Sequence, residues 1–105
     1  MKQYKVIVQS DARSDFRRCV NYLLYKKRNR QAAESLIRDF DETVDTLSHI
    51  AGSIREHDSE VLKTRNLKRL NFGKHDYFLL FRIDGSKAIV TNIFHGTEDF
   101  ESKLS

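Results

Sequence analysis

The sequence predicts a single α+β domain over residues 1–105, with an antiparallel helix hairpin packed on a small, mainly antiparallel sheet. Apolar residues recur at helical spacing in the first half of the chain, and they alternate or run together at strand spacing in the second half. Prolines are absent and there are four glycines, so little of the chain is available for linkers. The expected order is β-α-α-β-β-β, followed by a short C-terminal helix.

A short strand is expected at residues 4–8, where apolar side chains alternate around Val6. A helix follows over about residues 11–25, with Ser10 as its N-cap and Asp11 near its positive end. Its buried stripe consists of Ala12, Phe16, Cys19, Val20, Leu23 and Leu24. The single cysteine therefore fills the core, and alone it forms neither an internal disulfide nor a cysteine-based zinc site.

A second, longer helix is expected to begin after Asn29, a favourable N-cap, and to end at Gly52, which suits the position after a helix C-terminus. Its apolar stripe consists of Ala33, Leu36, Ile37, Phe40, Val44, Leu47, Ile50 and Ala51. Because few residues separate the helices, they should pack as an antiparallel hairpin on one face of the sheet. We expect the other face to be partly open, and residues 53–64 to form a surface connection with a short helical turn.

Three strands of a meander are expected after this connection. Residues 66–72 alternate loosely, residues 77–83 form the nearly continuous apolar run of a central strand, and residues 88–94 are rich in β-branched side chains. Asp84-Gly85 indicates a tight hairpin turn between the last two. Beyond the sheet, Thr97 is expected to cap a short final helix, with acidic residues at its positive end.

Charge is strongly segregated, although the formal net charge is only +4. Residues 11–30 hold seven basic residues and two acids, residues 39–60 hold seven acids and one base, and residues 63–74 hold five basic residues and no acid. The last block lies on or beside the first meander strand and predicts a positive partner or target surface, made of Lys63, Arg65, Lys68, Arg69 and Lys74. The alternative is that the blocks are ordinary solvated faces, with the acidic second helix partly paired to the basic first helix.

Several functional classes are not supported by the sequence. It has no phosphate loop, nucleophile elbow or metal-ligand spacing of histidines, so neither a metal nor another cofactor is expected. No apolar run approaches the roughly 18 residues of a membrane span, and the first residues lack the apolar region of a signal peptide. We therefore expect a cytoplasmic protein with no membrane partner, which the low cysteine content also favours.

Two histidines lie near the ends of the expected strands. In a hairpin that turns at Gly85, the numbers of paired residues sum to about 170, which places His95 opposite about residue 75. An RNA-cleaving site needs a general base, a general acid and cations for the phosphate. Candidate catalytic residues for such a site are His95, Lys68, Arg69, His75 and Tyr77. The alternative is two edge histidines without a catalytic task.

The order of elements, the central segment Tyr77–Asp84 and the ending Ile93–Phe100 together resemble the RelE/ParE superfamily of bacterial toxins over essentially the whole chain. The ending His95-Gly96-x-x-Asp99 is similar to that of ParE-type plasmid-stabilisation proteins. The resemblance implies the toxin of a type II toxin–antitoxin system, which arrests growth and is neutralised by a cognate antitoxin. We expect an acidic antitoxin that folds on binding, and we add His95 and Asp99 to the predicted partner or target surface.

The resemblance implies two different targets. ParE-like members act on DNA gyrase and are not enzymes, whereas RelE-like members are metal-independent endoribonucleases that cleave mRNA on the ribosome. Lys68 and Arg69 match the basic residues of RelE-type sites, but the arginine expected at the start of the central strand is absent, as are the C-terminal base and tyrosine. The residues there are Asp76, Tyr77, Phe78, Thr97, Glu98 and Phe100. The chain is therefore closer to ParE-like members, with a nuclease that uses His95, or a non-toxic relative that binds an antitoxin, as alternatives.

Overall fold

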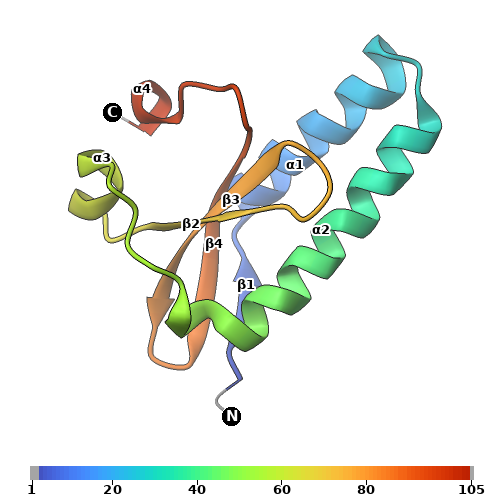
Figure 1. Cartoon of the computed structure of the whole chain (residues 1–105). Helices are drawn as coiled ribbons and strands as arrows, with labels where there is room; N and C mark the ends of the chain where they lie inside the picture. Colours follow the sequence, from blue (N-terminus) through green and yellow to red (C-terminus); the bar gives the residue numbers. More distant parts are fainter. Residues whose placement is uncertain (1–2, 105) are drawn as a thin grey trace.

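The computed structural model describes residues 3–104, and its elements follow the predicted order (Figure 1). They are β1 (Lys5–Val8), α1 (Ser10–Asn21), the π-helical turn η1 (Tyr22–Lys26), α2 (Arg30–Ile50), the 3₁₀ turn η2 (Ala51–Ser53), α3 (Glu60–Thr64), β2 (Lys68–Asn71), β3 (Tyr77–Asp84), β4 (Lys87–His95) and α4 (Phe100–Leu104). The fold class is the predicted α+β. α3 lies at the end of the segment expected as a surface connection, and α4 is the predicted final helix.

The strands form one mixed sheet in the order β1-β4-β3-β2. β2, β3 and β4 make the predicted antiparallel meander, while β1 pairs in parallel with β4, with Val6 opposite Ala88. Parallel pairing requires a crossover connection, and the chain between β1 and β4 contains the helix hairpin that covers the sheet. The sheet is thus mainly antiparallel, and its edge strands are β1 and β2.

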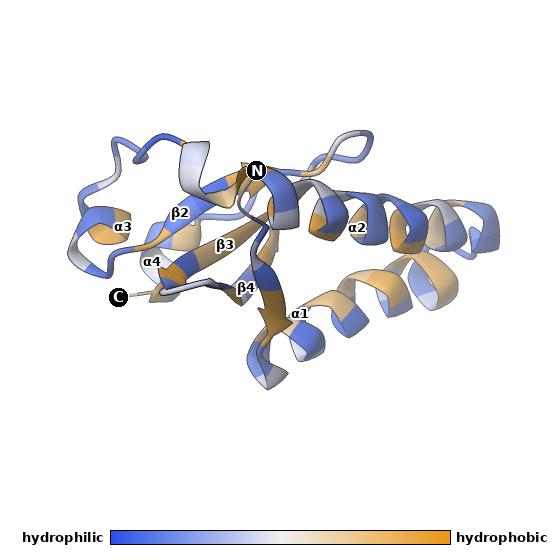
Figure 2. Ribbon diagram, turned by 90° about the horizontal axis from the view of Figure 1, so that it is seen from below, coloured by the Kyte–Doolittle hydropathy of each residue, from blue (hydrophilic) through white to orange (hydrophobic). Residues whose placement is uncertain are grey.

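α1 and α2 run antiparallel and cover one face of the sheet, as predicted (Figure 1). Figure 2 shows the apolar sides of these helices turned inward and their polar sides turned outward. The Phe16 and Phe40 rings stack between the helices with centroids 4.4 Å apart. The buried residues of this core are Ala12, Leu36, Leu47, Ala51, Phe72, Leu79, Phe81, Ala88, Val90 and Ile93. Burying this surface holds the hairpin on the sheet.

The opposite face of the sheet is also covered, so the expectation of a partly open face is wrong. Phe78, Leu80 and Phe94 are buried there together with Leu62 of α3 and Leu67. Phe100 and Leu104 of α4 pack against this second core. The reason lies in the continuous apolar run of β3: neighbouring side chains of a strand point to opposite faces, so such a run needs cover on both sides.

The helix ends confirm one predicted cap and correct three other assignments. The Asn29 side chain accepts a hydrogen bond from the Ala32 N–H at 3.0 Å, as predicted for the N-cap of α2. α1 begins at Ser10 itself, and Gln9 takes its N-cap position. Gly52 lies within η2 rather than in a left-handed C-terminal position, and a Cβ there would overlap the Tyr4 hydroxyl. At α4 the cap is Asp99 and not the predicted Thr97, since the Asp99 carboxylate accepts hydrogen bonds from Ser102.

A buried carboxylate ties the connection between β2 and β3 to the helix hairpin. Asp39 of α2 is 2% exposed. Its oxygens accept hydrogen bonds from the backbone N–H groups of Gly73, Lys74 and His75, the shortest being 2.7 Å to His75 N–H. The first acid of the block 39–60 is therefore an internal anchor, and not a solubilising or helix-pairing charge.

We predict that Asp39→Ala lowers the free energy of unfolding by about 2 kcal/mol, because three N–H groups in a partly buried position lose their acceptor. Urea unfolding followed by circular dichroism measures the change. Asp41→Ala, two residues along the same helix at an exposed position, is the matched control and should change stability by less than about 0.5 kcal/mol. Equal stability of the two variants would contradict the anchoring role.

Candidate functional site

The pairing of the last two strands differs from the predicted pairing near His95. Asp84 pairs with Lys87 at the turn, but beyond an irregularity next to Leu80 and Phe81 the register moves by one residue and Tyr77 pairs with His95. Thr91 is the residue of β4 that has no partner in this register. The prediction that His95 lies opposite about residue 75 is therefore wrong. The two-residue turn raises the sum of paired residue numbers from the assumed 170 to 171, and the bulge raises it to 172.

His75 does not meet His95. Its Nε2 atom lies 2.9 Å from the Ser35 hydroxyl of α2, and its backbone N–H donates to Asp39. The ring that contacts His95 is that of Tyr77, with centroids 4.9 Å apart in an edge-to-face arrangement. His95 Nδ1 is 2.7 Å from the Thr97 hydroxyl. Of the five catalytic candidates, the structure thus brings together Tyr77 and His95.

The two basic residues of β2 lie away from this pair. Lys68 and Arg69 are opposite Phe81 and Leu80, three to four residues along β3 from Tyr77, which is roughly 10–13 Å at the rise of a strand. The Arg69 guanidinium lies 3.7 Å from the centre of the Phe78 ring, on the sheet face that α4 covers. Burial lowers the pKa of Arg69, as expected for a cation stacked on a core aromatic ring.

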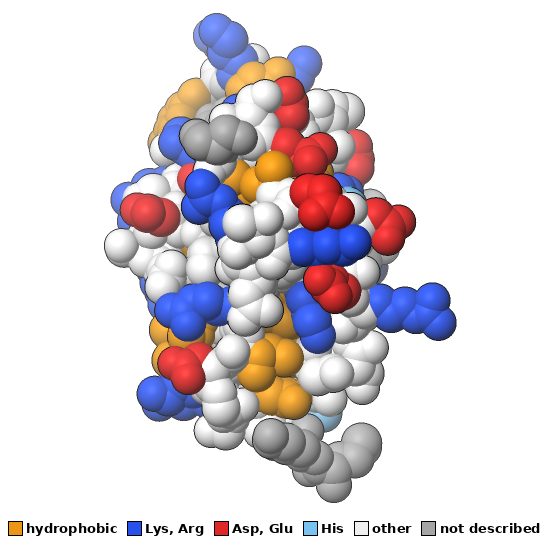
Figure 3. Space-filling view, turned by 90° about the vertical axis from the view of Figure 1, so that its left-hand side faces the viewer, with side chains coloured by type: hydrophobic (Ala, Val, Ile, Leu, Met, Phe, Trp, Pro, Cys, Tyr) orange, Lys and Arg blue, Asp and Glu red, His pale blue; other side chains and the backbone are white. Residues whose placement is uncertain are grey.

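The other three cations of the block 63–74 each contact a carboxylate or a carbonyl group of the protein. Lys63 pairs with Glu60 at 3.8 Å, and Lys74 pairs with Glu42 at 3.9 Å. The Arg65 guanidinium donates to the backbone carbonyl of Leu104 in α4. Figure 3 looks onto the side of α3 and α4 and shows acidic and basic side chains interspersed. The positive partner surface proposed for this block stays a prediction, and the block is less uniformly basic in space than along the chain.

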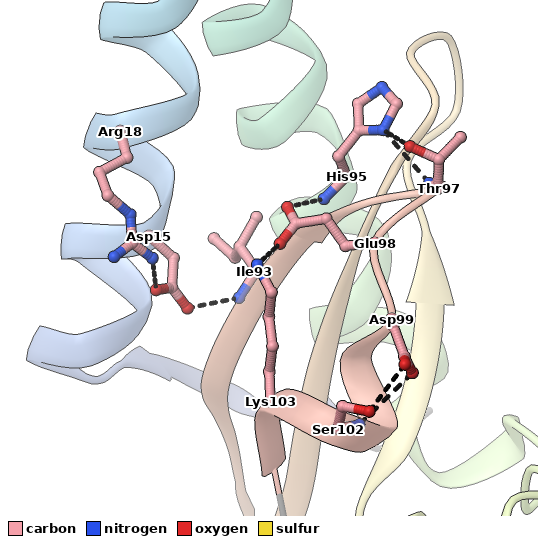
Figure 4. A network of polar contacts seen from close by, with 9 residues as sticks. All are labelled: Asp15, Arg18, Ile93, His95, Thr97, Glu98, Asp99, Ser102 and Lys103. Atoms are coloured by element: carbon pink, nitrogen blue, oxygen red, sulfur yellow. Dashed lines mark hydrogen bonds and ion pairs between the residues drawn. The ribbon is translucent and has the colours of Figure 1, made fainter.

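A half-open cavity of about 770 Å³ lies between α1, the end of β4 and the segment leading into α4. Side chains of both charges and two tyrosines line it, namely Asp15, Arg18, Cys19, Tyr22, Tyr77, Asn92, Ile93, Phe94, His95, Thr97, Glu98 and Lys103. Figure 4 shows that its carboxylates are engaged on both oxygens. Asp15 accepts from Arg18 at 2.5 Å and from the Ile93 N–H at 3.0 Å. Glu98 accepts from the His95 N–H at 2.9 Å and from Lys103 at 2.5 Å.

The environment of the cavity shifts the protonation of its groups in different directions. Burial raises the pKa of Asp15 and of Tyr77, and it raises the pKa of the Cys19 thiol to about 11. Burial also opposes ionisation of Glu98, but hydrogen bonds from Lys103 and the His95 N–H outweigh it and lower the pKa of Glu98. The thiol is thus a poor nucleophile at neutral pH, in agreement with its predicted place in the core.

The ending His95-Gly96-x-x-Asp99 has a structural role. Gly96 donates its N–H to the Asp76 carbonyl at 2.8 Å, and a Cβ at this position would overlap the Asp76 carboxylate. Asp99 accepts from the Ser102 N–H at 3.4 Å and from the Ser102 hydroxyl at 2.7 Å, and these hydrogen bonds lower its pKa. Asp99, and not the predicted Thr97, therefore caps α4. The motif makes the turn from the sheet into that helix.

The charged cluster of Asp15, Arg18, Glu98 and Lys103 was missed by the sequence reasoning. These residues come from α1 and from the C-terminal segment, and their spacing matches no motif.

Within residues 3–104, no three His, Cys, Asp or Glu side chains are arranged to hold a metal ion. Across the same residues, no helix has the length and apolar character that crossing a membrane requires.

We predict that Lys103→Gln raises the pKa of Glu98 toward the ordinary value of a glutamate, measured by NMR titration of the carboxyl carbon. A lowered native pKa adds stability above the ordinary pKa, and this stability is lost as the pH falls through the lowered value. The unfolding midpoints of the variant and the wild type should therefore differ at neutral pH and converge in acid. Lys87→Gln, at the exposed hairpin turn, is the control, and a Glu98 pKa that Lys103→Gln leaves unchanged would contradict the ion pair.

Comparison with known proteins gives the family. A scan against protein-family models matches residues 6–100 to the family described as ParE toxin of type II toxin-antitoxin system, parDE. A solved chain of the chromosomal ParDE TA system from P. aeruginosa has the same fold, with a TM-score of 0.71 and 18% identity over 90% of this chain and 98% of that chain. A search of the curated proteins finds no significant match. On the family match, which covers nearly the whole sequence, the chain belongs to the ParE toxin family of type II toxin–antitoxin systems.

Proposed function

We propose that this toxin arrests growth by inhibiting DNA gyrase and that a cognate antitoxin neutralises it. Membership of the ParE family supports the toxin role, and the geometry of the candidate site supports gyrase over mRNA as the target. The proposal places the protein in the cytoplasm, where gyrase acts. It requires contact surfaces rather than a reactive centre.

One observation carries the choice of target: the groups of a nuclease do not converge. Cleavage of RNA needs a base, an acid and phosphate-binding cations around one scissile bond. Tyr77 and His95 are in contact, but Lys68 lies several residues along the sheet and Arg69 is stacked on the opposite face. The cations that do line the cavity, Arg18 and Lys103, are paired with carboxylates. This arrangement favours an interaction protein.

A second, smaller groove is the surface that we propose for antitoxin binding. It has a volume of about 340 Å³ and lies along the helix hairpin, lined by Val8, Arg13, Phe16, Arg17, Val20, Ile37 and Phe40. The lining is apolar except for two arginines, and Ile37, which is part of the lining, is 41% exposed. An apolar side chain carried by an acidic segment that folds on binding would match both the groove and its arginines.

We predict that the purified protein inhibits supercoiling of relaxed plasmid by gyrase and that its antitoxin restores supercoiling. Full supercoiling with the protein in excess would contradict the proposed target. Primer extension on translated mRNA distinguishes the nuclease alternative, because cuts at the ribosomal A site would then appear in wild type and disappear in His95→Ala. Normal growth during induced expression would instead identify a non-toxic, antitoxin-binding relative.

We further predict that Ile37→Glu weakens antitoxin binding at least tenfold, or about 1.4 kcal/mol, because a carboxylate would enter the apolar groove. Calorimetric titration with the antitoxin measures the loss. Ile50→Glu is a matched control on the same helix, since Ile50 is 40% exposed, close to the 41% of Ile37, and does not line the groove. Equal affinity of the two variants would show that the antitoxin binds elsewhere.

A further inference from the structure

The tip of the helix hairpin is a strongly basic part of the chain. The hairpin runs beyond the sheet, and its tip is formed by η1 and the turn into α2 (Figure 1). Between Asp15 and Asp39 the sequence contains a single acid, Glu34. The seven basic residues of that interval are Arg17, Arg18, Lys26, Lys27, Arg28, Arg30 and Arg38. Four of these seven, Lys26, Lys27, Arg28 and Arg30, lie at the tip itself, and the stretch from Tyr22 to Ala33 contains no acid.

The cations at the tip are accessible. Lys26, Lys27 and Arg28 are exposed in consecutive positions. Arg30 pairs with Glu34 at 3.3 Å, but both side chains are largely in water, at 86% and 54% exposure. Exposed pairs of this kind are weak and exchange readily with solvent or another anion. A polyanion approaching the tip would therefore meet several cations at small cost.

The backbone of the tip brings aromatic rings to the same surface. Lys27 follows the π turn directly and is exposed. Its Nζ atom lies 5.7 Å from the centre of the Tyr22 ring. Arg28 then takes a left-handed conformation with φ 50°, which closes the turn.

The two tyrosines of the tip are unusually exposed, Tyr22 at 48% and Tyr25 at 74%. Residues 22–28 therefore combine two accessible rings with three consecutive cations. Cationic side chains beside flat aromatic rings are the pairing that proteins use for polynucleotides, with phosphates on the cations and unpaired bases stacked on the rings. We infer that the hairpin tip is a nucleic-acid-binding surface, in which Lys26, Lys27 and Arg28 contact phosphates and Tyr25 stacks on an unpaired base.

The composition of the tip favours a polynucleotide over an anionic lipid surface. A helix that inserts into a membrane interface carries a broad apolar face with residues such as Trp, Phe and Leu opposite its cations. Among residues 3–104, the exposed large apolar side chains are Tyr22, Tyr25, Ile37 and Ile50, and the two isoleucines lie farther along α2. This surface goes beyond the proposed function, because gyrase inhibition and antitoxin binding do not require the toxin itself to hold nucleic acid.

The test is fluorescence anisotropy with labelled oligonucleotides of about 20 residues, as single-stranded DNA, single-stranded RNA and duplex DNA, over a range of salt concentrations. The variant Lys26→Gln, Lys27→Gln, Arg28→Asn removes three charges from the tip. The control Lys5→Gln, Arg55→Gln, Lys87→Gln removes three exposed charges outside the hairpin and has the same net charge. Circular dichroism verifies that both variants are folded.

We expect the tip variant to bind single strands at least tenfold more weakly than the wild type. The slope of log affinity against log salt concentration should become shallower by about 2, because each lost phosphate contact on a single strand contributes about 0.7. The control should bind within about twofold of the wild type. Tyr25→Ala should reduce single-strand affinity about tenfold, and Tyr25→Phe should retain it. Comparison of the DNA and RNA oligonucleotides shows which kind of single strand the tip binds more tightly.

Three results would overturn the inference: no binding by wild type, an equal loss in both triple variants, or binding to anionic vesicles with none to oligonucleotides. A supercoiling assay on the same proteins separates this inference from the proposed function. Binding without gyrase inhibition would remove the proposed function and leave the inference standing. Gyrase inhibition without nucleic-acid binding would overturn this inference and leave the proposed function standing.

Discussion

β3 is apolar on both of its faces, and this property determines how the rest of the chain is arranged. Leu79 and Phe81 point to the helix hairpin, while Phe78 and Leu80 point to the other side. A strand of this kind is stable only when both faces are covered. The hairpin provides one layer, and α3 and α4 provide the other. The two five-residue helices, which have little stability of their own, exist because the second face of β3 must be buried.

This second layer has consequences for function. α4 has to be placed over Phe78 and Phe94, so the segment that leads to it crosses the end of β4. In this segment the Glu98 carboxylate accepts a hydrogen bond from the His95 N–H, and Thr97 and Glu98 form part of the cavity lining. It also places Arg69 under α4, stacked on a ring. Groups that could have bound a phosphate are therefore engaged in core packing and in hydrogen bonds within the protein.

The elements of the fold were predictable because they follow from periodicity. The stripe from Ala12 to Leu23 has the helical period, and the length and composition of the run from Tyr77 to Ile83 are those of a buried strand. The relations between elements were not predictable in the same way. The bulge at Thr91 has no obvious signal in the sequence, yet it changes the partner of His95 by one residue, to Tyr77. Asp39 resembled its acidic neighbours until its three N–H partners, more than thirty residues away, were known. The part of the site that could not be predicted depends on contacts between single side chains that are far apart in the sequence.

The hairpin divides into two regions with different tasks. Near the sheet its inner faces belong to the core, and the groove lined by Phe16, Val20 and Ile37 is apolar. Beyond the sheet no core exists to be filled, and the chain changes to exposed tyrosines and cations through the π turn at Tyr22–Lys26. A turn whose only role was to connect two helices would not need this composition, since a few polar residues suffice. The projecting end therefore carries exposed rings and cations that folding does not require, which is why we assign the inferred nucleic-acid binding to it.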